Sequence, residues 1–110
     1  MALAFAAHAD LVLTTGAAAQ SNIITEFWDA YGLSIVAPAT LTSTAITILV
    51  TNSTVFGATL ATLQSGGTDV VLTAGKSLTI TPVAYRQLQL QGSAVEVAAR
   101  TFTVAKVFPT

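Results

Sequence analysis

Residues 77–81 read Ser-Leu-Thr-Ile-Thr and residues 87–91 read Gln-Leu-Gln-Leu-Gln, and these two stretches decide the fold class. In both, every second residue is apolar and the others are Ser, Thr or Gln, which is the period of a β-strand with one buried and one solvated face. Residues 100–104 repeat the pattern, with Phe102 and Val104 on one face. The connections between such strands are short, which favours antiparallel pairing.

The same kind of alternation, interrupted by turn residues, predicts further strands on both sides of these stretches. They cover residues 11–14, 33–37, 45–51, 55–63, 69–73 and 95–107. Strands at intervals of roughly ten residues are typical of a sandwich or small barrel. The sequence therefore predicts an all-β fold: a single antiparallel β-sandwich of about eight strands. We favour a jelly-roll-like topology, while an immunoglobulin-like sandwich stays open because strand count does not separate the two.

Residues 21–31 contain an aromatic stretch whose secondary structure is ambiguous. The apolar residues in it have a spacing that fits a helical face as well as a strand. Because predicted strands lie on both sides, we favour strands that are broken by a turn at residues 29–32. Trp28 is then expected to be a core or interface anchor, with a sugar-stacking platform as the functional alternative.

The composition indicates a protein that is covered by partners. The 110 residues suffice for one domain. They are 53% hydrophobic and only 8% charged, whereas ordinary globular chains are about 25% charged. An apolar excess of this size usually means that part of the surface is buried in an assembly, so we expect a homo-oligomer.

The charges also exclude some partners. The net charge is −1 with four Lys and Arg residues, so the chain offers no basic stripe for phosphates and nucleic-acid binding is not expected. Residues 30–68 carry no charge, but Gly, Pro, Ser and Thr interrupt them too often for a membrane-spanning helix of about twenty apolar residues. We expect no membrane partner.

The N-terminal residues 1–10 are expected to form an arm, and residues 11–110 the β-sandwich domain. The start of the chain resembles a secretory signal in its apolar residues, but it lacks the basic segment, and His8 and Asp10 interrupt it. A terminal segment is ordered only when it is docked. We therefore expect the arm to lie against the domain or against a neighbouring subunit.

The titratable residues do not form a pattern that carries chemistry. Cysteine is absent and His8 is the one histidine, so we expect no metal site and no cofactor. Asp29 and Asp69 flank predicted turns, where a short carboxylate usually bonds to backbone amides. With no accompanying nucleophile or base, we expect no catalytic residues and no enzyme.

The candidate functional residues are those of a partner interface. Glu96 and Arg100 lie four residues apart near a predicted strand, so they share a face at a distance, and we hypothesise an intersubunit ion pair. The N-terminal arm and the aromatic stretch supply the apolar anchors. The predicted interface consists of Leu3, Phe5, Phe27, Trp28, Tyr31, Glu96 and Arg100.

The order of these features resembles that of small β-sandwich virion proteins of tailed bacteriophages. The resemblance lies in Leu-Val-Leu-Thr-Thr-Gly at 11–16, Pro-Ala-Thr-Leu-Thr at 38–42 before the strand at 46–50, Leu-Gln-Leu-Gln-Gly-Ser at 88–93 and Ala-Ala-Arg-Thr-Phe-Thr-Val at 98–104. It is a pattern of strands and turns that covers most of the chain after residue 10. The arm and residues 27–31 depart from it.

The resemblance implies a non-enzymatic capsid cement or decoration protein on the virion surface. Such a protein, with a trimer favoured, would clamp neighbouring subunits of the major capsid protein. Two alternatives stay open. A phage tail or neck component would share fold and composition, and a carbohydrate-binding module would use Trp28 and Tyr31 as its aromatic platform.

Overall fold

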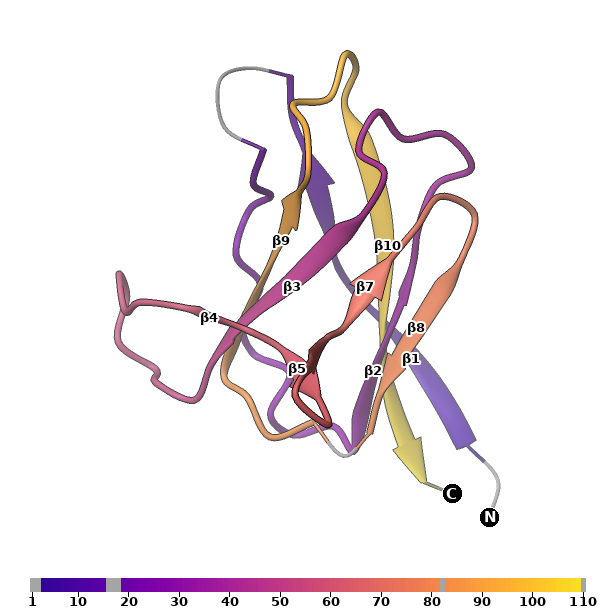
Figure 1. The fold of residues 1–110 in the computed structure, drawn as a ribbon. Helices are drawn as coiled ribbons and strands as arrows, with labels where there is room; N and C mark the ends of the chain where they lie inside the picture. Colours follow the sequence, from indigo (N-terminus) through magenta and orange to yellow (C-terminus); the bar gives the residue numbers. More distant parts are fainter. Residues whose placement is uncertain (1–2, 16–18, 82, 110) are drawn as a thin grey trace.

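The computed structural model describes residues 3–15, 19–81 and 83–109, and these form two antiparallel sheets that face each other (Figure 1). The first sheet has four strands in the order β1-β10-β2-β8. They are β1 (Leu3–Leu13), β10 (Arg100–Pro109), β2 (Gly32–Val36) and β8 (Ser77–Ile80). The first and last strands are thus neighbours, and both termini lie at the same end of the molecule.

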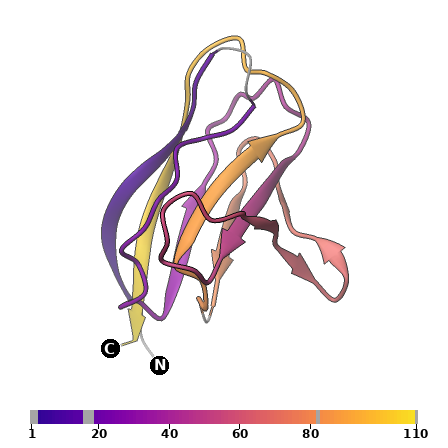
Figure 2. The same cartoon turned by 90° about the vertical axis from the view of Figure 1, so that its left-hand side faces the viewer.

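The second sheet is built around β3 (Ile46–Thr51), which pairs with β9 (Gln87–Gly92) along its whole length. On its other side β3 pairs with two short strands, β7 (Val71–Leu72) and β4 (Ala61–Thr62). Between these two in the chain, β5 (Gln64–Ser65) and β6 (Thr68–Asp69) form a small separate hairpin. Figure 2 shows the two layers from the side.

Residues 20–24 complete the strand order of the second sheet. They lie along β9 through isolated bridges, with Ser21 N donating to Leu90 O and Ile24 N to Leu88 O, at 3.0 and 2.9 Å. Successive strands therefore alternate between the two sheets. The exception is that β3, β4 and β7 all belong to the second sheet. This is the strand order of a jelly roll, so the predicted all-β, jelly-roll-like sandwich is confirmed.

The core lies between the two sheets and follows the predicted alternation. Leu88 and Leu90 of β9 are fully buried, as are Phe102 and Ile35 of the first sheet. Phe27 reaches the same core from the connection between β1 and β2. The largest fully buried side chains are Phe27, Phe102, Leu11, Leu13, Leu33, Ile35, Ile46, Ile48, Leu72, Leu88, Leu90 and Val107.

Three predicted segments differ from the structure. Residues 21–31 form neither full strands nor a helix: their backbone makes isolated bridges at Ser21 and Ile24, and the Asn22 side chain bonds to β1. Residues 55–60 form a loop, since Gly57 adopts a φ of 86° and Ala58 N donates to Val55 O in a turn. Residues 95–99 are also irregular, and β10 begins only at Arg100.

The expected N-terminal arm takes the form of a strand. From Leu3 onward it is the first part of β1, paired with β10 from Leu3↔Pro109 to His8↔Val104, before the register shifts between His8 and Leu11. Met1 and Ala2 lie outside the described residues. The segment is therefore held by backbone pairing within this chain.

Substitution of Phe102 tests how much the core between the two sheets contributes to stability. Its fully buried ring contacts side chains from both sheets, so Phe102→Ala should lower the free energy of unfolding by about 3 to 5 kcal/mol in urea titrations. Val97→Ala removes an exposed side chain and should change it by less than about 0.5 kcal/mol. Similar small losses for both variants would contradict this core.

Candidate assembly surface

Residues 3–8 of β1 pair with residues 104–109 of β10 at one end of the sandwich (Figure 1), and we call this paired segment the ribbon. β1 is the edge strand of the first sheet. Its inner half is covered, because Asn22 Oδ1 accepts a hydrogen bond from Val12 N at 2.8 Å and Asn22 Nδ2 donates to Asp10 O at 3.1 Å. Toward the terminus, Leu3 and Phe5 are exposed, Phe5 to 63%. Apolar side chains thus stand on an edge strand that another chain can approach.

The connection between β1 and β2 brings two more aromatic residues to this end. Tyr31 N donates to Val107 O at 3.0 Å, which fixes Tyr31 beside the ribbon. Trp28 is three residues before it, and both side chains are exposed. Leu3 and Phe5 are thus exposed on β1, Tyr31 lies beside β10, and Trp28 is exposed in the connection that leads to Tyr31. We call these four residues the terminal surface.

The charges beside the terminal surface are engaged within the chain. The Lys106 ammonium lies 3.3 Å from the Asp29 carboxylate and 5.7 Å from the centre of the Phe108 ring. The Arg86 guanidinium lies 5.4 Å from the centre of the Trp28 ring, a cation–π contact. Arg86 of the same chain therefore covers part of the Trp28 ring.

Two predicted interface residues belong to the interior instead. Phe27 is fully buried in the core, and its ring packs against that of His8 with centroids 6.1 Å apart. Glu96 is only 3% exposed, and its Oε1 lies 3.0 Å from Arg100 Nε of the same chain. The hypothesis of an intersubunit ion pair is thus corrected, because the irregular backbone between Glu96 and Arg100 lets them pair within one chain.

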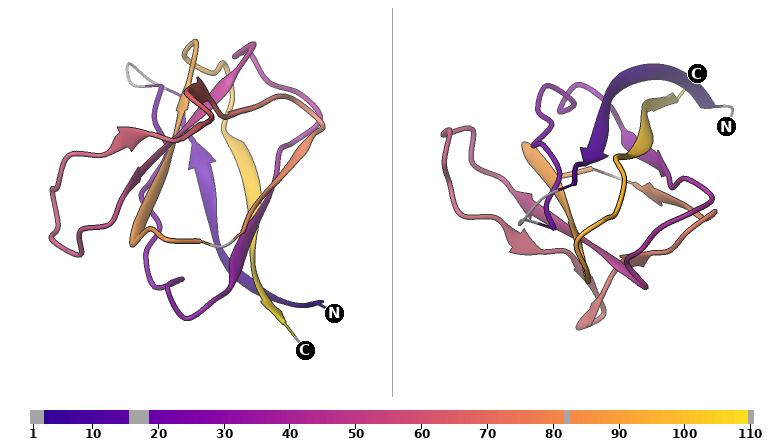
Figure 3. Two further views of the ribbon diagram at one scale, coloured as in Figure 1. Left: turned by 60° about the horizontal axis from the view of Figure 1, so that its bottom comes forward. Right: turned by 90° about the horizontal axis from the view of Figure 1, so that it is seen from above.

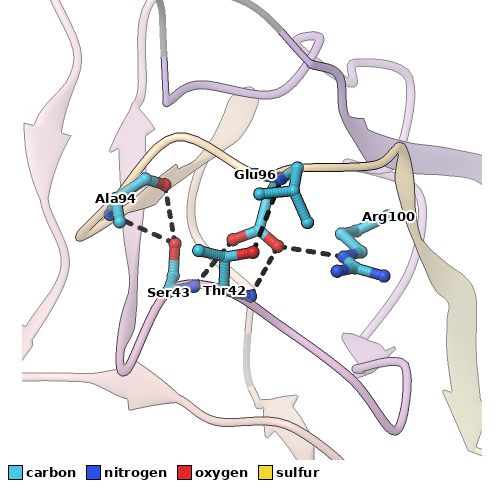
Figure 4. Close-up of polar contacts among 6 residues, drawn as sticks. Thr42, Ser43, Ala94, Glu96 and Arg100 are labelled. Atoms are coloured by element: carbon cyan, nitrogen blue, oxygen red, sulfur yellow. Dashed lines mark hydrogen bonds and ion pairs between the residues drawn. The ribbon is translucent and has the colours of Figure 1, made fainter.

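Glu96 fastens the loop before β3 to the loop before β10 (Figure 4). Its carboxylate accepts hydrogen bonds from the backbone amides of Thr42 at 2.7 Å and Ser43 at 2.8 Å. The Ser43 hydroxyl in turn donates to Ala94 O at 2.9 Å. The cluster thus joins residues that are more than fifty positions apart in the sequence.

These contacts hold Glu96 ionised. Burial by itself would raise the pKa of its carboxyl group, but the amides of Thr42 and Ser43 outweigh it, together with the Ser43 and Arg100 side chains. The net effect lowers the pKa to about 2 from 4.5. The cluster is therefore a structural clamp and not a proton-transfer site.

Sequence reasoning missed one exposed apolar pair. Val55 and Phe56 lie in the loop between β3 and β4, and Phe56 is 96% exposed. The sequence pattern predicts a strand at residues 55–63, in which one of two adjacent apolar residues would face the core. The signal that could have revealed the loop is Gly57 directly after them, which favours a turn.

The remaining titratable residues do not gather into a further site. Among the described residues, no three His, Asp or Glu side chains lie close enough to hold a metal ion. His8 instead bonds through Nε2 to Thr25 O at 2.8 Å. No helix in the described part of the chain is long and apolar enough to cross a membrane.

Comparison with known proteins gives one relationship, at the level of structure. The sequence matches no known protein family and no curated protein. Among solved structures, the chain is similar to a protein of Bacillus endospore appendages, which form a novel family of disulfide-linked pili. The TM-score is 0.50 with 17% sequence identity, over 97% of this chain and 89% of that chain. The similarity shows a shared β-sandwich fold.

The lowered pKa of Glu96 predicts a pH-dependent stability. Because the folded state favours the ionised carboxylate, its contribution is complete above about pH 5 and is lost as the pH falls toward 2. Glu96→Gln should lower the free energy of unfolding by about 2 to 3 kcal/mol at pH 7. The difference from the unmodified chain should shrink as the pH falls.

The control for this prediction is Glu26→Gln, since Glu26 is exposed. Its urea titrations should follow those of the unmodified chain at every pH. A difference between Glu96→Gln and the unmodified chain that stays constant from pH 7 to pH 2.5 would contradict the clamp.

Proposed function

We propose that this protein is a non-enzymatic structural subunit that works by assembly. Its place would be the surface of a phage capsid, where it acts as a cement or decoration protein and bridges neighbouring subunits of the major capsid protein. It would do so as a homo-oligomer, with a trimer favoured. The resemblance of the strand-and-turn pattern to small β-sandwich virion proteins of tailed bacteriophages supports this proposal.

The terminal surface is the observation that carries the proposal. Leu3, Phe5, Trp28 and Tyr31 are exposed at one end, and the adjacent Asp29 and Lys106 neutralise each other within the chain. Exposed apolar side chains are a feature of protein–protein contact surfaces. Aromatic anchors with few competing charges are also what the centre of an interface contains.

A polymer of identical subunits is the second candidate, and a different observation favours it. The similar solved structure belongs to a pilus-forming appendage, which is likewise a structural protein and supports a non-enzymatic role here. That appendage is disulfide-linked, whereas this chain contains no cysteine. A polymer of this chain would therefore be held by non-covalent contacts instead of disulfides, and these could include β-strand pairing between subunits.

The cement proposal is tested on purified particles. Phage particles from the source of the sequence, isolated on a density gradient, should contain the chain at a constant molar ratio to the major capsid protein in quantitative mass spectrometry. Absence of the chain from the particles would refute the capsid role. Fibres of the purified protein in electron microscopy would favour the polymer instead.

Substitutions in the terminal surface test the contact itself. Phe5→Ser combined with Trp28→Ser removes two exposed anchors, so particles stripped of the chain should rebind this variant at least tenfold more weakly. Val97→Ser, an exposed apolar residue outside the terminal surface, is the matched control and should rebind normally. Equal binding of both variants would show that the terminal surface does not make the contact with the particle.

A further inference from the structure

The loop at residues 52–60, between β3 and β4, presents an apolar knob. Phe56 is 96% exposed and its neighbour Val55 is 67% exposed. The loop projects away from the sandwich at the left of Figure 1. No residue in it is charged. An aromatic ring that extends fully into water is unfavourable unless a partner covers it.

The knob is held in place by hydrogen bonds beneath it. Gln87 is buried, and its Nε2 donates to Ser53 O at 2.9 Å and to Val55 O at 3.0 Å. Val55 N donates to the Ser53 hydroxyl at 3.1 Å, and Gly57 completes the turn with a positive φ. Because the backbone is already ordered, binding through this loop would cost little conformational entropy.

A pocket of about 470 Å³ lies between β8 and the β5–β6 hairpin. Its apolar walls are Leu63, Val70, Leu78, Ile80 and Tyr85. Ser, Thr and Gln side chains complete the lining, and none of the lining residues is charged. The volume is within the range of pockets that bind small organic groups, about 300 to 1,000 Å³.

We propose that Phe56, with Val55, inserts into this pocket of a second copy of the chain. The inference rests on the proposed role in assembly and names one of its contacts. The pocket offers apolar side chains for the ring to contact, and neither the loop nor the pocket lining carries a charge, so insertion would desolvate no ion in either. The β3–β4 loop and β8 lie on different sides of the sandwich (Figures 1 and 3), so the contact joins separate copies.

The proposed contact is head-to-tail, because each chain offers a knob on one side and a pocket on the other. Such a heterologous contact forms a closed ring if the rotation between copies closes, and an open filament if it does not. A ring of three would give the trimer expected for the cement protein. Each single contact is small, and the assembly gains strength from its multiplicity.

Matched pairs of variants test the contact by sedimentation over a range of concentrations. Phe56→Ser removes the knob and Ser65→Arg fills the pocket, and both residues are exposed. Each should raise the dissociation constant for self-association at least tenfold. Val97→Ser controls for loss of an exposed apolar residue, and Thr68→Arg, opposite Ser65 in the hairpin but outside the pocket lining, controls for the added charge. Both controls should assemble like the unmodified chain.

Mixing the two defective variants gives the decisive result. The intact knob of Ser65→Arg can enter the intact pocket of Phe56→Ser, and the pair can grow no further, so the mixture should contain heterodimers whereas each variant alone stays monomeric. Circular dichroism should show that both variants are folded. A mixture that stays monomeric, or assembly that is unchanged by Phe56→Ser, would overturn the proposal.

Failure of this contact is distinguishable from failure of the proposed function. Oligomers that form independently of Phe56 would overturn the knob-in-pocket contact alone and leave the structural role in place. A chain that neither self-associates nor occurs in particles would refute both.

Discussion

The pairing of the first strand with the last is the interaction on which the rest of the structure depends. β10 lies between β1 and β2, and Phe102 and Val104 on its inner face are buried in the core. Beyond the core, β1 and β10 continue together as a ribbon. This brings Leu3 and Phe5 to the end where Trp28 and Tyr31 lie, so the same backbone pairing closes the fold and creates the terminal surface.

Four of the nine charged residues are paired with one another within the chain. Glu96 and Arg100 clamp two loops, and Lys106 pairs with Asp29. Among the exposed apolar residues, Leu3, Phe5, Trp28 and Tyr31 make up the terminal surface, and Val55 and Phe56 lie in the β3–β4 loop. A subunit with more than one contact surface is suited to bridging neighbours in an assembly, where individually weak contacts add up.

The sequence predicted those parts of the fold that depend on local periodicity. The alternating stretches at 77–81 and 87–91 form β8 and most of β9, because a buried face imposes the period of two. The parts that depend on distant partners were missed. Glu96 is buried because the backbone amides of Thr42 and Ser43 donate hydrogen bonds to its carboxylate. No local sequence pattern predicts a contact between residues so far apart in the chain. Phe27 and Trp28 are adjacent in sequence, yet only the folded backbone decides which of them faces the core.

The measurement that decides most directly whether this chain works by assembly is the mass of the 110-residue chain in solution, obtained by light scattering at increasing concentration. If the chain assembles, its mass should rise with concentration to a multiple of the 11.2 kDa chain. The mass should reach a plateau for a closed ring and continue to grow for a filament. A mass of one chain at every concentration would contradict assembly, because the exposed apolar residues would then be compatible with a protein that stands alone.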